Sequence, residues 1–329
     1  MLLSLLTLLS CRAASGSRDS TQTERPAPRP FVKIYADLYS GLTAADRSSA
    51  FEVRRAYFGY KADLNDRYSA EVKLDIGSPN DISEYSRIRR YAYFKTAAFY
   101  YKTEKCFLKF GIIDIDLFKL EEDLWDHRYI AKSFMDIHRF GDIADLGAGF
   151  RYKVSDLLSA DLTVSNGEGY THLQSDNAFK TGLGFSLTPY KDLLIRMFTD
   201  YTETTERQLT FSSFVTYATG KATLGIEYDY KINRDFVLNH DLYGISGFLS
   251  YRIGRKAEAF FRYDRLTSNI PGDEDRPWNL IDDGSALFGG LQYRLTDGLR
   301  AALTYRDWVP LASNLDNLRY LYLNFEIRF

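Results

Sequence analysis

The sequence predicts an all-β fold, a transmembrane antiparallel β-barrel of about 16 strands that extends from residue 31 to residue 329. Segments of about ten residues alternate apolar and polar side chains along the whole of this stretch, as barrel strands do between lipid and water. Tyr (25 residues) and Phe (23) dominate the apolar residues, although charged residues make up 26% of the chain. No apolar run reaches the roughly 18 residues that a membrane-spanning helix needs.

The alternation holds from the first segment to the last. Val32, Ile34, Ala36 and Leu38 share one face at the start, and Leu321, Leu323, Phe325, Ile327 and Phe329 share one face at the end. A half-buried soluble sheet also alternates, but here charges of both signs lie at mid-strand, where a packed core could not bury them. Tyrosines near the segment ends suit the aromatic girdles of a membrane interface: Tyr60, Tyr68, Tyr100, Tyr217, Tyr228, Tyr251, Tyr263, Tyr293 and Tyr305.

Sixteen strands are expected, an even number that brings both chain ends to one side. They are residues 31–39, 51–60, 68–77, 91–101, 106–113, 144–152, 158–165, 179–188, 193–201, 208–218, 222–231, 242–251, 257–265, 286–294, 299–306 and 318–329. Short turns alternate with longer connections, including one expected near 202–207, as periplasmic turns alternate with outer loops in such barrels. The third long connection, residues 114–143, is expected to fold inward and to form a short helix over 117–125.

The first 30 residues read as export and linker sequence. Residues 1–15 are predicted to be a signal peptide, because an apolar run is followed by small residues, although no Lys or Arg precedes that run. Residues 8–11 also fit a lipidation motif at Cys11, and this alternative stays open beside an ordinary cleaved signal. Residues 16–30 are polar and proline-rich, which predicts a disordered leader.

Residues 51–60 (FEVRRAYFGY) resemble the second-strand signature of the phosphate-selective porin O and P family. Further matches are residues 110–112 ahead of the long third loop, residues 145–149 (DLGAG) and residues 165–169 (SNGEG). The resemblance implies a sixteen-stranded, usually trimeric porin of the Gram-negative outer membrane, whose third loop enters the pore and whose cationic side chains guide anions. It also implies that the terminal Phe329 is read by the barrel-assembly machinery.

Eleven basic residues fall on the face expected to line the lumen: Lys33, Arg55, Lys73, Lys95, Lys109, Arg151, Arg196, Arg262, Arg294, Arg300 and Arg306. Acidic residues share this face, and one interpretation is that each cation is paired with a carboxylate of a neighbouring strand. Arg54 and Arg55 are adjacent, so only one should face the lumen while the other lies at the rim or at a trimer contact.

The third loop is expected to form the constriction. Its charged residues are Asp114, Asp116, Lys119, Glu121, Glu122, Asp123, Asp126 and Arg128. An acidic loop that faces basic walls predicts a transverse electric field across the opening, which would sort polar solutes and lowers the expectation of phosphate selectivity. The helix could narrow or plug the channel, or it could rest on the rim.

Chemistry beyond transport is not predicted. All four histidines lie in expected loops, no two show metal-ligand spacing on one strand, and no nucleophile or phosphate-binding motif occurs. The sequence therefore predicts no enzyme, metal or cofactor, and a net charge of −2 gives no signal for nucleic acid.

The predicted function is passive diffusion of small polar or anionic solutes through a water-filled lumen. The alternative is a closed barrel that serves as a receptor, adhesin or scaffold. Expected partners are outer-membrane lipid, lipopolysaccharide and small solutes, and the resemblance also implies the assembly machinery and two further copies of the chain in a homotrimer.

Overall fold

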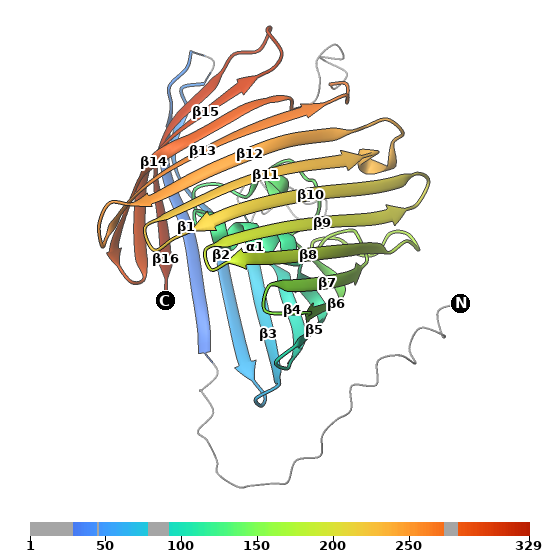
Figure 1. Ribbon diagram of the computed structural model, residues 1–329. Helices are drawn as coiled ribbons and strands as arrows, with labels where there is room; N and C mark the ends of the chain where they lie inside the picture. Colours follow the sequence, from blue (N-terminus) through green and yellow to red (C-terminus); the bar gives the residue numbers. More distant parts are fainter. Residues whose placement is uncertain (1–28, 45, 78–91, 273–281) are drawn as a thin grey trace, which may run out of the picture.

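The computed structural model describes residues 29–44, 46–77, 92–272 and 282–329, and its strands wrap into one closed antiparallel barrel (Figure 1). Each strand pairs with the next along the chain, and β1 (Arg29–Gly41) pairs with β16 (Leu318–Arg328), so the sheet has no free edge. Closure lets every strand bond to two neighbours, which a chain inside a lipid bilayer requires. The predicted sixteen-stranded antiparallel barrel is confirmed.

The remaining strands are close to the predicted ranges. They are β2 (Ser49–Asp63), β3 (Tyr68–Ile76), β4 (Ala92–Lys102), β5 (Cys106–Asp114), β6 (Ala144–Lys153), β7 (Leu158–Ser165), β8 (Lys180–Tyr190), β9 (Leu193–Glu203), β10 (Arg207–Ala218), β11 (Ala222–Ile232), β12 (Leu242–Arg252), β13 (Ala257–Ser268), β14 (Gly284–Thr296) and β15 (Leu299–Pro310). A 3-10 turn, η2 (Arg234–Phe236), lies between β11 and β12. The connection expected near 202–207 is only residues 204–206, because cross-strand pairing continues to Glu203 and Arg207. The predicted signal peptide and Cys11 lie outside the described residues, as does the leader up to residue 28.

The two faces of each strand differ as the alternation predicts. On the outer face, Phe110 is 67% exposed and Ile226 is 57% exposed, whereas their inward neighbours Lys109 and Glu227 are buried. A barrel in hydrocarbon requires this arrangement, with apolar side chains exposed on the outside and charged side chains enclosed on the inside.

The third long connection enters the barrel, where Figure 1 shows α1 inside the ring of strands. It contains α1 (Asp116–Trp125) and the short α2 (Phe134–Ile137), which confirms an inward-folded loop with a helix near residues 117–125. No helix in the described part of the chain is long and apolar enough to cross a bilayer.

Candidate functional site

The third loop is held inside the barrel by an apolar cluster that joins it to the inner wall. Trp125, at the end of α1, is 1% exposed, and its ring centroid lies 5.4 Å from that of Phe248 and 6.2 Å from that of Phe260. Its indole Nε1 donates to the carbonyl oxygen of Ala131 at 3.0 Å, which closes the turn after the helix. Because the wall phenylalanines point inward, the loop is fixed by the burial of aromatic rings as well as by charge.

Arginines of the wall bind the backbone of the same turn. Arg54 donates to the carbonyl oxygens of Tyr129 and of Ile130, the latter at 3.2 Å, and Arg306 donates to the carbonyl oxygen of Ile130. Arg262 donates from Nη1 to the carbonyl oxygen of Lys132 at 2.5 Å. These arginines come from β2, β15 and β13, so the turn is bonded to widely separated parts of the wall.

A β-bulge brings Arg54 inward beside Arg55. Tyr35 pairs with Arg55 and the next residue, Ala36, pairs with Val53, so Arg54 is an extra residue on β2. Arg54 forms an ion pair with Asp37 on β1. The expectation that the two arginines point to opposite faces is therefore wrong, because a bulge interrupts the period of two on which it rested.

A second bulge lies at Lys95 on β4. Lys73 pairs with Thr96 and Leu74 pairs with Phe94, which leaves Lys95 as the extra residue. Lys95 and Thr96 are both buried on the inner face. The bulge also turns Tyr100 inward, where its ring stacks on Phe107 at 5.7 Å and its backbone pairs with Lys109. Tyr100 therefore does not belong to the predicted outer aromatic girdle.

Cross-strand register and burial place all eleven predicted basic residues on the inner face. Seven have a carboxylate oxygen within 4.0 Å: Arg55 with Asp75, Lys73 with Asp114, Lys109 and Arg151 with Asp116, Arg196 with Asp161, Arg262 with Asp264, and Arg300 with Glu326. No such pair is formed among the described residues by Lys33, Lys95, Arg294 or Arg306. Most of the eleven basic residues are therefore paired with a carboxylate, as one interpretation of the sequence expected. Whether their side chains guide solutes stays a prediction.

The acidic residues of the loop touch the wall instead of facing it across water. Asp114 lies 3.4 Å from Lys73, and Asp116 lies 2.7 Å from both Lys109 and Arg151. Residue 126 ends α1 in a left-handed conformation, with φ of 50°, and its carboxylate bonds to Arg300 at 2.9 Å. Contact pairs cancel much of each other's field, so these residues anchor the loop, and the expected transverse field stays a prediction.

Other loop charges pair within the loop. Glu122 and Asp136 lie 3.4 and 3.6 Å from the buried guanidinium of Arg128, and Lys119 pairs with Asp123 one turn along α1. Burial opposes ionisation of Glu122, but Lys95 and Arg128 together hold its pKa below the ordinary value. The loop thus carries a compact charge network of its own.

Glu121 is the exception among the loop acids. It is 2% exposed and faces the inner wall, where Glu227 and Asp229 of β11 are also buried. Burial and the charges of these two carboxylates raise the pKa of Glu121 well above its ordinary value. The helix is therefore packed onto its wall through a carboxyl group that favours its neutral, protonated form.

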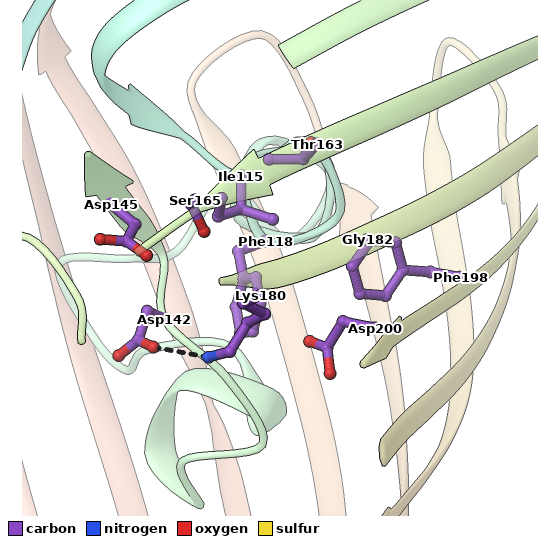
Figure 2. Close-up of a pocket in the computed structure, with 10 residues that line it drawn as sticks. All are labelled: Ile115, Phe118, Asp142, Asp145, Thr163, Ser165, Lys180, Gly182, Phe198 and Asp200. Atoms are coloured by element: carbon purple, nitrogen blue, oxygen red, sulfur yellow. Dashed lines mark hydrogen bonds and ion pairs between the residues drawn. The ribbon is translucent and has the colours of Figure 1, made fainter. Parts of the chain in front are cut away.

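The base of the loop is also packed against the wall, as Figure 2 shows. Lys180 of β8 donates to Asp142 at 3.1 Å, and Asp145 accepts the backbone N–H of Gly167 at 2.6 Å. The space left between Phe118, Lys180 and the wall is a cavity of about 20 Å³. That is room for about one water molecule, so little space separates the loop base from β6–β9.

A larger cavity of about 690 Å³ lies beside α2 and the loop base. Its lining includes Arg55, Lys132, Asp136, Lys180 and Lys231, with both signs of charge represented. A cavity of this size and polarity is a water-accessible vestibule within the barrel.

One histidine of the third loop, His127, is held by contacts at both ring nitrogens. His127 is buried in the third loop, with Nδ1 2.6 Å from the carbonyl oxygen of Trp125 and Nε2 3.0 Å from Glu258. Within the described ranges, no group of three His, Cys, Asp or Glu side chains could hold a metal ion.

Solved structures that resemble this chain are outer-membrane barrels at low sequence identity. OprB of Pseudomonas putida aligns with a TM-score of 0.69 and 10% identity over 92% of this chain and 94% of its own. OmpF of Salmonella typhi, solved in complex with daunomycin, aligns with a TM-score of 0.68 and 11% identity over 92% of this chain and 97% of its own. The outer membrane channel DcaP of Acinetobacter baumannii aligns with a TM-score of 0.67 and 8% identity over 92% of this chain and 97% of its own.

No family model matches the sequence, and a search of curated proteins finds no match. At these identities the likeness to solved structures establishes the fold, which is that of the sixteen-stranded outer-membrane barrels.

Proposed function

We propose that the protein is a porin of the Gram-negative outer membrane, through which small polar or anionic solutes diffuse passively. The observation that carries this proposal is the charged inner face of a closed barrel, together with the vestibule of about 690 Å³ beside the third loop. Charged groups that lie in a wet lumen replace part of a solute's hydration shell, which lowers the barrier to its passage.

The pairing of inner cations supports weak selectivity and argues against a dedicated phosphate channel. A phosphate needs several unpaired donors, whereas seven of the eleven basic residues already hold a carboxylate. Lys95 and Arg306 have no carboxylate oxygen within 4.0 Å among the described residues, which supports a mild preference for anions. Kinship with the phosphate-selective porin O and P family rests on the sequence motifs alone.

Single-channel recording in planar bilayers tests this function. We expect stable conductance steps from the purified, folded protein, and a KCl gradient should give a reversal potential shifted by a few millivolts toward the chloride equilibrium potential. A folded protein that inserts but never conducts would refute the porin function.

A closed barrel that acts as a receptor, adhesin or scaffold is the second candidate. It is favoured by one observation: the loop contacts separate parts of the wall, since Trp125 packs on Phe248 of β12 and the ring of Tyr129 lies 6.4 Å from that of Tyr35 on β1. The absence of conductance, combined with full heat-modifiable folding on gels, would support this candidate.

We also propose that the chain forms a homotrimer and that the assembly machinery reads Phe329. OmpT of Vibrio cholerae, another structural neighbour, was solved in a trimer form at 15% identity. Phe329 is 75% exposed beside β1, where a receptor could reach its ring. Light scattering of the detergent-solubilised protein tests the trimer, and the yield of folded Phe329→Ala in outer membranes tests the signal.

A further inference from the structure

A pocket of about 250 Å³ lies between α2 and the inner face of β13–β16, toward the end of the barrel that carries the outer loops. Phe288, Trp308, Tyr320 and Tyr322 supply aromatic surfaces to its lining. Their cross-strand partners place Phe288, Trp308 and Tyr322 on the inner face, so the pocket opens to the lumen side and not to lipid.

Arg306 gives this aromatic pocket a positive charge. No carboxylate oxygen of the described residues lies within 4.0 Å of its guanidinium, whose carbon is 4.0 Å from the centroid of Tyr322 and 5.9 Å from that of Phe288. One nitrogen, Nη2, donates to the carbonyl oxygen of Ile130, while the buried Nε has no partner in the described part of the chain. The lining has two acidic groups. Asp264 is bound by Arg262 through two hydrogen bonds of 2.8 and 2.7 Å, and Oδ2 of Asp307 accepts from Tyr305 at 3.1 Å and from Arg319 at 3.2 Å. Oδ1 of Asp307 is buried without a partner among the described residues, so a bound carboxylate must lie on the Arg306 side of the pocket.

His138, at the end of α2, adds a neutral polar group. It is 8% exposed, its ring centroid is 6.4 Å from that of Trp308, and its Nε2 has no hydrogen-bond partner among the described residues. Burial lowers the pKa of His138 to about 4, so the ring is neutral at pH 7 and can donate or accept one hydrogen bond.

We propose that this pocket is a binding subsite for small aromatic carboxylates. The aromatic walls match a planar apolar body, and the unpaired guanidinium of Arg306 matches one carboxylate. An engineered cavity of about 150 Å³ holds benzene, so a pocket of about 250 Å³ has room for one ring with its carboxylate. Inorganic phosphate would need more hydrogen-bond donors than Arg306 and His138 supply. As a step in transport the subsite rests on the proposed function, whereas binding itself does not require conduction.

The test is calorimetric titration of the full-length protein in detergent with benzoate, benzamide and acetate, and with inorganic phosphate and glucose as competing chemistries. Benzamide keeps the ring without the charge, and acetate keeps the charge without the ring. We expect benzoate to bind at least tenfold more tightly than either probe. Equal affinities for the three probes overturn the proposal, and tighter binding of inorganic phosphate or glucose overturns it in favour of a plain anion or sugar site.

Two variants and a control locate the binding. Arg306→Gln should weaken benzoate at least tenfold and abolish the difference from benzamide, and Trp308→Leu should weaken benzoate but not acetate. Trp308→Leu keeps the test decisive if the loss of the Ile130 contact prevents Arg306→Gln from folding. Arg252→Gln removes a 59% exposed arginine at the far end of β12 and should leave the affinity within twofold. Unchanged benzoate binding in both pocket variants overturns the assignment.

Conductance separates the two proposals. A channel that conducts but does not bind benzoate refutes the subsite and leaves the porin function standing. A protein that binds benzoate but never conducts refutes the porin function and leaves the subsite standing.

Discussion

Replacing Trp125 with Ala should release the third loop from the inner wall without unfolding the barrel. The indole is almost fully enclosed, contacts the rings of Phe248 and Phe260, and donates one hydrogen bond to Ala131. Truncation of a buried Trp to Ala costs about 3–5 kcal/mol. Since about 1.4 kcal/mol is a factor of ten, the ratio of released to docked loop should rise by roughly two to three and a half powers of ten. None of the barrel's strand pairs includes Trp125.

The assay is single-channel recording of Trp125→Ala beside wild type. We expect larger open-channel noise and a higher mean conductance, because a released loop fluctuates in the lumen. Phe110→Ala is the matched control: it removes an aromatic ring that is 67% exposed on the outer face, and it should leave both quantities unchanged. Wild-type noise and conductance in Trp125→Ala would refute the inference that aromatic burial holds the loop.

The remaining predictions concern the bulge, the buried acid and the lipid face. Arg54→Gln leaves the carboxylate of Asp37, whose side chain is 1% exposed, without its ion pair, and should lower the unfolding free energy by about 3–5 kcal/mol in denaturant titrations; a loss below about 1 kcal/mol would contradict the pairing. Because burial raises the pKa of Glu121, the folded state keeps a proton that the unfolded chain loses above about pH 4.5, so wild-type stability falls as pH rises toward the raised pKa. Glu121→Gln should therefore raise the thermal midpoint at pH 8 and leave it unchanged near pH 4, and an equal gain at both values contradicts the reasoning. Ile226→Lys places a charge at mid-strand on the outer face, and it should make the free energy of folding into lipid less favourable by about 2–4 kcal/mol. The control Leu157→Lys lies in a turn and should cost about 0–1 kcal/mol. Equal costs for the two variants would argue against a bilayer around the barrel.

The strands could be predicted from the sequence because the period of two is strong wherever one face meets lipid. Around Ile226, apolar and polar residues alternate through β11, and the structure places the apolar ones on the outer face and the polar ones on the inner face. Bulges could not be predicted this way. An inserted residue such as Arg54 or Lys95 moves each later residue of the strand to the opposite face from the one that the alternation predicts. Nothing in the local composition marks the position of the insertion.

The aromatic contacts that hold the third loop were also not predicted, although the sequence contains a pattern that indicates them. Inward phenylalanines sit directly beside outward apolar residues, as in Phe214–Val215, Phe248–Leu249 and Phe260–Phe261. Such adjacent apolar pairs break the expected alternation. They indicate that the wall is apolar on both faces at these positions, and therefore that another segment packs against its inner face. Sequence reasoning identified the charged residues of the loop and of the wall but not which of them pair, because the pairs form only after the loop has folded inward.

Water accessibility along β3 tests most directly whether alternate side chains face lipid and a wet lumen. Single cysteines would be placed at Glu71, Val72, Lys73 and Leu74 in a Cys106→Ser background and exposed in lipid vesicles to a charged, membrane-impermeant thiol reagent. We predict that the cysteines replacing Glu71 and Lys73 are labelled rapidly, whereas those replacing Val72 and Leu74 stay at the level of the parent protein. Equal labelling of all four positions, or the reverse pattern, would contradict the account.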